Sequence, residues 1–186
     1  MYTVEPNEIP ACAPIRTRRL VIRPYHSGDA YSLLRYHGRA DVCRYLLNEP
    51  WTLDDAREVV HTRVSRRSIA DGAVALVVEY KGRVVGNMAA WLVDGTDHTA
   101  ELGWVFSPDF AGQGFATEAV TALVELVFAD PRLHRVIAQM DSRNERSARL
   151  AERIKMRQEA HFRQNLWIKN EWTDTVVFAA LRSERT

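Results

Sequence analysis

Two glycines mark the part of this chain where residue type and spacing point most directly to chemistry. Gly112 and Gly114 follow an aromatic and β-branched run that ends at Phe106, and they precede an apolar-periodic segment that begins at Ala116. The order is strand, glycine loop, helix. A helix start carries N–H groups without partners and the positive end of the peptide dipole, and glycines let a bulky group approach the main chain. The sequence therefore predicts an anion site, most simply for a phosphate or pyrophosphate.

The residues after the glycines show which of the known phosphate-binding loops this sequence could match. A P-loop needs a Lys-Ser/Thr pair there, whereas Gly114 is followed by Phe115 and Ala116. A dinucleotide-binding fingerprint needs Gly or Ala at the position of Thr117, so it fits badly. The spacing that remains is Ala111-x-x-Gly114-x-Ala116 directly after a strand.

This spacing resembles the coenzyme A pyrophosphate loop of the GNAT N-acetyltransferases. Other segments resemble the RimJ/RimL-like branch of that family, namely Thr17–Pro24 with Asp29, the Asn144-x-x-Ser147 pair and Trp172–Asp174. The resemblance runs from about Ile15 to Leu181. It implies acetyl-coenzyme A as co-substrate and direct transfer of its acetyl group to a primary amine, either a protein N-terminus or a small-molecule amine.

The resemblance also implies which residues hold the cofactor. Main-chain groups of the strand pair with the pantetheine arm, those of the loop bind the pyrophosphate, and one helix-start side chain contacts the cofactor. These residues are Trp104, Val105, Phe106, Ala111, Gly112, Gln113, Gly114, Phe115, Ala116, Thr117 and Asn144. A backbone N–H near Val105 is the expected donor to the carbonyl oxygen. Ala111 stands where many relatives carry Arg or Gln, so a charge-assisted phosphate contact is lost there.

Glu101 is the candidate general base. Period-2 alternation puts Glu101, Gly103 and Val105 on one face of the strand, and a carboxylate in a covered sheet is costly unless it is paired or functional. Burial would raise its pKa toward a range useful for accepting a proton, directly or through a water. The structural alternative is a strand-end Glu neutralised by an Arg, and His98 is the rival base.

Many relatives place a tyrosine in the helix that corresponds to residues 142–153 to protonate the leaving thiolate, but in this chain that segment contains none. Ser147, the only hydroxyl well inside the helix, is therefore the candidate acid. The resemblance implies this role for a serine near this position. The structural alternative is that Asn144 caps a helix and Ser147 is a small packing residue. Relatives turn after this helix with Gly-Phe, whereas this chain has Lys155-Met156, so Lys155 must adopt an unusual backbone conformation or the turn must differ.

The composition of the chain limits which other kinds of protein it could be. The chain has 186 residues, 46% hydrophobic and 26% charged, with a net charge of +1, which favours one soluble domain and gives no global field for nucleic acid or an anionic membrane. Cys12 and Cys43 form neither a metal-ligand spacing nor a disulfide framework, so we expect no metal and a cytoplasmic location. The N-terminal residues lack a signal-peptide core, and no apolar run approaches transmembrane length.

The pattern of elements predicts an α+β (mixed α/β) fold. Strand-like runs at 20–22, 73–80, 83–93, 100–106, 135–140, 161–169 and 172–181 make about seven strands, mostly antiparallel, with one parallel strand-helix-strand crossover. The GNAT resemblance implies a twisted sheet that is splayed at the acetyl-coenzyme A cleft, with helices on both faces. We expect an N-terminal arm at 1–14 and a single domain at 15–186.

Two further functions and one assembly remain open. A noncatalytic acyl-coenzyme A binding or sensing protein on the same fold is the main alternative, because of Ala111, the absent tyrosine and Lys155-Met156. A nucleotide-binding module is weaker. Exposed aromatics such as Trp167 and Trp172 could pair two copies into a homodimer.

Overall fold

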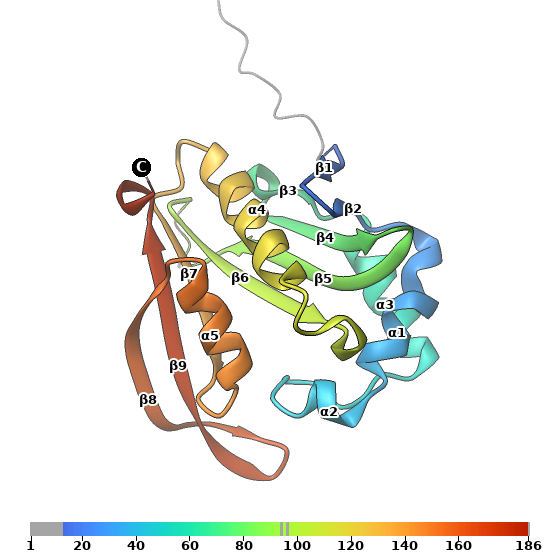
Figure 1. The fold of residues 1–186 in the computed structure, drawn as a ribbon. Helices are drawn as coiled ribbons and strands as arrows, with labels where there is room; N and C mark the ends of the chain where they lie inside the picture. The colour runs from blue at the N-terminus through green and yellow to red at the C-terminus, as the bar shows by residue number, and fades with distance from the viewer. Residues whose placement is uncertain (1–12, 94, 96, 186) are drawn as a thin grey trace, which may run out of the picture.

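A single β-sheet forms the centre of the computed structural model, which describes residues 13–93, 95 and 97–185. The strands are β1 (Ile15–Arg16), β2 (Val21–Pro24), β3 (Arg67–Ser68), β4 (Ala73–Tyr80), β5 (Arg83–Leu92), β6 (Thr99–Phe106), β7 (Arg135–Asp141), β8 (Arg157–Ile168) and β9 (Glu171–Leu181). The helices are α1 (Ala30–His37), α2 (Ala40–Cys43), α3 (Leu53–Arg63), α4 (Phe115–Ala129) and α5 (Glu145–Arg153). The strand order is β1-β2-β4-β5-β6-β7-β9-β8, with β3 beside β4 (Figure 1).

The predicted fold class is confirmed. Apart from the two-residue strands β1 and β3, the sheet has the expected seven strands. Neighbours run antiparallel except β6 and β7, which are parallel and joined by α4. This is the one strand-helix-strand crossover that the sequence predicted, and it is where β6, the glycine loop and α4 follow each other.

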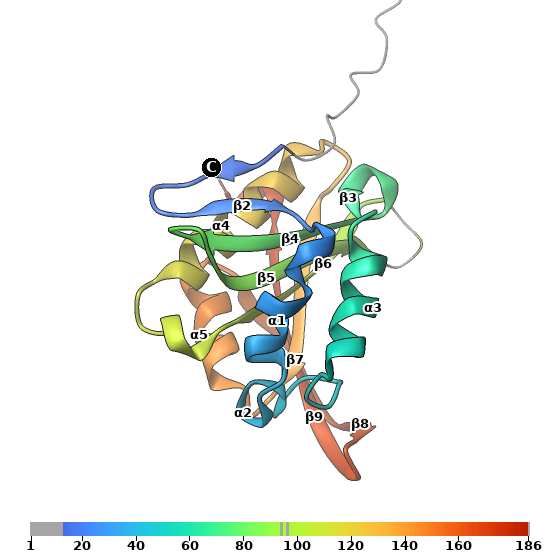
Figure 2. The same cartoon turned by 90° about the vertical axis from the view of Figure 1, so that its right-hand side faces the viewer.

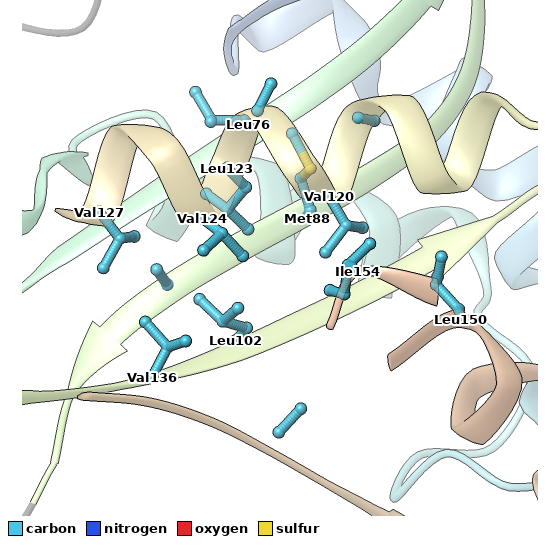
Figure 3. Packing of buried hydrophobic residues seen from close by; sticks show 14 of the residues in the cluster. Leu76, Met88, Leu102, Val120, Leu123, Val124, Val127, Val136, Leu150 and Ile154 are labelled. Carbon is cyan, nitrogen blue, oxygen red and sulfur yellow. The ribbon is translucent and has the colours of Figure 1, made fainter. Parts of the chain in front are cut away.

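Helices cover both faces of the sheet. Figures 1 and 2 show α4 and α5 on one face and α1 and α3 on the other. The larger core cluster lies under α4, where Leu123 and Val124 pack on Leu76, Met88 and Leu102 of the sheet (Figure 3). Fully burying each such side chain contributes about 1.5–3 kcal/mol, so α4 and the strand leading into its loop are held firmly.

A second, smaller cluster lies under α1 and α3. Leu33 and Tyr36 of α1 and Val60 of α3 pack there against Ala75 and Val77 of β4. The two faces of β6 are therefore distinct, since Leu102 belongs to the first cluster and Val105 packs against the second. The predicted face of Glu101, Gly103 and Val105 is the face toward α1 and α3.

Some expectations lie outside the described residues. Most of the predicted arm, including Cys12, is not described, so the boundary at residue 15 stays a prediction. Among the described helices, none combines the length and the apolar character that crossing a membrane requires. Likewise, the described part of the chain contains no group of three His, Cys, Asp or Glu arranged to hold a metal ion.

Candidate active site

The two parallel strands at the centre of the sheet separate along their length. Pairing of β6 with β7 is limited to Thr99, Ala100 and Glu101, which face Arg135, Val136 and Ile137. The rest of β6 continues to Phe106 paired on one side only, with β5. The splayed edge that the resemblance implied is therefore present, and it opens toward the glycine loop.

The register of β5 and β6 determines which main-chain groups face this edge. Ser107 donates to the carbonyl of Val85 at 2.9 Å, and Val93 donates to that of Thr99 at 3.0 Å. Antiparallel partners alternate between bonding each other and bonding outward. Position 105 therefore bonds to β5, whereas the N–H and C=O groups of residues 104 and 106 point into the gap.

This result divides the three strand residues expected to hold the pantetheine arm. Trp104 and Phe106 present main-chain groups to the open edge, and Val105 does not, because it is directed toward Asn87 of β5. The expected donor near Val105 is therefore better assigned to one of its two neighbours. The side chain of Val105 faces α1 and α3 instead.

The glycine loop has the geometry of an anion site. Gly112 and Gly114 have positive φ angles of 77° and 76°, which side chains rarely allow. The N–H groups from Gly112 to Thr117 have no hydrogen-bond partner within the described residues, and they lie at the N-terminus of the 15-residue helix α4. A phosphate-bearing ligand fits this loop, because it would satisfy donors that the protein leaves open.

Ala111 is an exception among the predicted loop residues. Its N–H donates to the carbonyl of Pro108 at 3.0 Å, so it closes a turn and is not available to a ligand. Its methyl side chain offers no donor either. Ala111 therefore marks the start of the loop without contributing a hydrogen bond to an anion.

Glu101 lies at the point where β6 and β7 diverge. It is half-buried, and its Oε2 accepts a hydrogen bond from Gln139 Nε2 of β7 at 3.3 Å. The rival base, His98, precedes β6 at the paired end of the two strands, and its Nδ1 lies 2.9 Å from the carbonyl of Arg132. Glu101 is thus nearer to the open edge than His98.

Asn144 and Ser147 meet at the start of α5. Asn144 Oδ1 accepts a hydrogen bond from the N–H of Ser147 at 3.2 Å, so Asn144 caps the helix as the structural alternative predicted. The cap occupies only the oxygen of the Asn144 amide, and its NH2 group, which has no partner in the described part of the chain, is left for a ligand. Both side chains are half-buried.

A buried polar cluster on the α1 side was not predicted from the sequence. Asn87 Oδ1 accepts from Tyr36 Oη at 2.7 Å and lies 2.8 Å from His37 Nε2, and the His37 ring stacks on Trp51 with ring centroids 3.7 Å apart. Burial lowers the pKa of His37 to about 4; the hydrogen bond with Asn87 partly opposes this shift, and the nearby charge of Arg63 adds to it. A single polar residue, Asn87, inside an otherwise apolar strand was the signal that could have revealed this cluster.

The same face carries a small cavity between the segment after α2 and the β8–β9 hairpin. Its lining includes Tyr45, Asp141, Arg143 and Thr175. Lys169, in the hairpin turn, donates to the carbonyl of Cys43 at 2.6 Å and so joins the hairpin to α2. Asp141 belongs to the same strand face as Gln139, so the cavity adjoins the face on which Glu101 lies.

Comparison with known proteins gives consistent matches over most of the chain. A family model described as "Acetyltransferase (GNAT) domain" matches residues 19–157. The uncharacterized N-acetyltransferase YnaD of Bacillus subtilis is 31% identical over 172 residues, which cover 91% of this chain and 98% of the relative. The ribosomal protein uS5-alanine N-acetyltransferase of Escherichia coli is 26% identical, covering 89% of each chain. A crystal structure of a GNAT-family acetyltransferase from Bacillus anthracis superposes with a TM-score of 0.83 at 30% identity, covering 92% of this chain and 99% of that one.

Proposed function

The chain belongs to the GNAT acetyltransferase family, and on that premise we propose how it performs acetyl transfer to an amine. Acetyl-coenzyme A binds along the open edge of β6 and the glycine loop, and the amine approaches from the α1–α3 face beside Glu101. The observation that carries this proposal is the run of N–H groups from Gly112 to Thr117, at the start of α4, that have no partner among the described residues.

The donor site is built from main-chain groups. Acetyl-coenzyme A supplies the acetyl thioester when it is bound. The open main-chain groups of Trp104 and Phe106 hold its arm as an added strand would, and the N–H groups of 112–117 hold its diphosphate. The Asn144 amide NH2 is the side-chain contact that we assign to the same ligand.

Two side chains move protons in this proposal. Glu101 takes a proton from the amine, directly or through a water, and Gln139 orients its carboxylate across the gap between the strands. The hydroxyl of Ser147, in the first turn of α5, gives a proton to the sulfur that leaves. The amine is thus deprotonated on one face of the sheet, and the leaving group is protonated from α5, on the other.

A peptide or protein amine is the acceptor that we favour, and small amines such as polyamines are the alternative. The likeness to an enzyme named for alanine N-acetylation of ribosomal protein uS5 supports the first.

Thiol release tests this function. Purified protein is mixed with acetyl-coenzyme A and, in parallel, with peptides that begin with different residues, with polyamines and with free amino acids. We expect thiol release above background with at least one peptide. Stabilisation by coenzyme A without release on any amine would instead support the acyl-coenzyme A sensor, and absence of both would contradict the donor site.

A second copy of this chain is the partner that we propose for the β8–β9 hairpin. Four large apolar side chains are exposed there: Trp172 on β9, and Phe162, Leu166 and Trp167 on β8, the edge strand, which within the described residues pairs only with β9. Sedimentation of the wild-type protein and of Trp172→Ser should show a dimer that the substitution weakens.

Cys43, which is buried as a free thiol, fits the cytoplasmic location that we propose.

A further inference from the structure

Arg19 lies against the glycine loop although it comes from the turn between β1 and β2, far away in sequence. Its Nη1 donates to the carbonyl of Gln113 at 2.7 Å, and its Nε donates to Glu118 Oε2 at 2.7 Å. The guanidinium also stacks over the ring of Phe115, 4.7 Å from the ring centroid. Three contacts therefore fix one side chain at the start of α4.

Glu118 anchors this arrangement from inside the helix. Its Oε1 accepts from Thr17 Oγ1 at 2.6 Å and from the N–H of Arg19 at 2.8 Å. Burial opposes its ionisation, but the hydrogen bonds from Thr17 and Arg19 prevail and hold the pKa of Glu118 below its usual range. A carboxylate in the first turn next to a phosphate site would repel the ligand, and here it is turned toward a cation.

The contact with Gln113 has a direct consequence for the loop. A trans peptide unit points its C=O and the following N–H in opposite directions. Since Arg19 holds the carbonyl of Gln113 on its own side, the N–H of Gly114 points to the other side, away from Arg19. Gly114 is one of the residues whose N–H has no partner within the described residues.

We propose that Arg19 is a positioning residue for the cofactor phosphates: it fixes the Gln113–Gly114 peptide so that the Gly114 N–H faces the diphosphate, and it neutralises Glu118 beside that site. This inference rests on the proposed function, because it assumes that coenzyme A binds at this loop. It is also consistent with the absence of a side-chain donor at Ala111, since the loop is ordered by Arg19 from outside it.

Two donors that differ in their phosphates test the inference. Steady-state kinetics are measured with acetyl-coenzyme A and with S-acetylpantetheine, which has no phosphate groups, on wild type and Arg19→Gln. We expect the KM for acetyl-coenzyme A to rise about 10-fold with kcat within about 2-fold, because the phosphate contact is lost equally in the ground state and the transition state. With S-acetylpantetheine, kcat/KM of the variant should equal that of wild type.

Two further variants separate position from charge and from stability. Arg18→Gln removes an equal charge one residue away, from an exposed side chain without hydrogen bonds or ion pairs in the described structure, and should match wild type. Arg19→Lys keeps the charge and the fold, but a lysine cannot bond Gln113 and Glu118 in one plane. Its KM for acetyl-coenzyme A should therefore lie between those of wild type and Arg19→Gln. Full recovery by Arg19→Lys would show that charge alone matters and would overturn the positioning role.

The remaining outcomes distinguish this inference from the function on which it rests. An unchanged dissociation constant for coenzyme A in Arg19→Gln, measured by calorimetry, overturns the inference alone. An equal loss with S-acetylpantetheine also overturns it, because the role would then be structural. If wild type binds no coenzyme A, the proposed function itself fails.

Discussion

Gln139 Nε2 and Glu101 Oε2 lie 3.3 Å apart across the point where β6 and β7 diverge. Each residue is on the face toward α1 and α3, because Leu102 and Ala138 next to them belong to the core on the opposite face. The carboxylate is therefore held where the paired part of the two strands ends. A base at this place can reach a group that enters from the α1–α3 face while the donor occupies the open edge.

Glu101→Gln should remove proton abstraction with little effect on folding. The substitution keeps the size of the side chain, so we expect kcat to fall roughly 100-fold, within the range that general bases contribute. The acid limb of the kcat/KM profile against pH should also disappear, which stopped assays across pH would show. Gln139→Ala serves as the control, since it leaves Glu101 in place and should lower kcat by less than 10-fold. An unchanged pH profile in Glu101→Gln would remove Glu101 from the mechanism.

Asn144 offers a pair of substitutions that separates capping from cofactor binding. Asn144→Ser keeps a cap acceptor and loses the amide NH2, whereas Asn144→Ala loses both. We expect both to raise the KM for acetyl-coenzyme A several-fold, and only the alanine variant to lose about 1 kcal/mol of unfolding free energy in urea titrations. A wild-type KM in Asn144→Ser would leave Asn144 with the cap role alone.

Ser147→Ala tests the acid. If its hydroxyl protonates the leaving sulfur, kcat should fall about 10-fold or more, while the melting temperature stays close to wild type because alanine favours helices. Ala148→Ser adds a hydroxyl at the neighbouring position and shows whether any serine there restores turnover in the Ser147→Ala background. Full turnover in Ser147→Ala alone would sink the assignment.

The sequence predicted most of what local pattern determines. The bounds of β4 follow from its continuous apolar run, and the start and end of α4 follow from Gly114 and from the stop at Asp130. The turns Lys81-Gly82 and Lys169-Asn170 have positive φ at both positions, as two-residue hairpins require.

Long-range contacts could not be predicted in the same way. Arg19 meets Gln113 and Glu118 only because β2 joins the sheet beside β4, and nothing near Arg19 in the sequence indicates that. The different roles of Trp104 and Val105 depend on hydrogen-bond register, which a period-2 pattern does not reveal. Which loop N–H groups lack a partner among the described residues, and that the N–H of Ala111 is engaged, likewise can be known only from coordinates.

Lys155 gives a prediction for stability. Its φ angle is 67°, in the left-handed region where a Cβ is costly, and the Met156 N–H closes the helix end on Ala151. Lys155→Gly should raise the unfolding free energy by about 1 kcal/mol, which corresponds to a melting temperature about 2–4 °C higher. Lys155→Ala removes the same exposed side chain without relieving the strain and should show no gain. Equal gains in both variants would point to the lost charge instead of the backbone.

His37 predicts how stability depends on pH. Its Nε2 faces Asn87 Oδ1, which is an acceptor, so the proton is on Nε2, and the bare Nδ1 is buried without a partner in the described structure. Protonation would bury a charge and a donor that has no acceptor, which explains why burial takes the pKa of His37 from 6.5 to about 4. Because the folded pKa is depressed, the neutral imidazole's stabilisation is fully present above pH 6.5. It is lost as the pH falls from 6.5 to about 4, where the unfolded chain binds the proton and the folded one does not.

The size of this effect is up to about 3 kcal/mol, at 1.36 kcal/mol per pKa unit. Urea titrations at steps between pH 7 and pH 4 should show it as a falling unfolding free energy. His37→Phe keeps the stack on Trp51 and cannot titrate, so its curve should be flatter than wild type by about that amount over the same window. The carboxylates that also titrate below pH 5 are common to both proteins and cancel in the difference. Parallel curves for wild type and His37→Phe would mean that His37 is already solvated when folded, and that the buried cluster with Tyr36 and Asn87 is open to water.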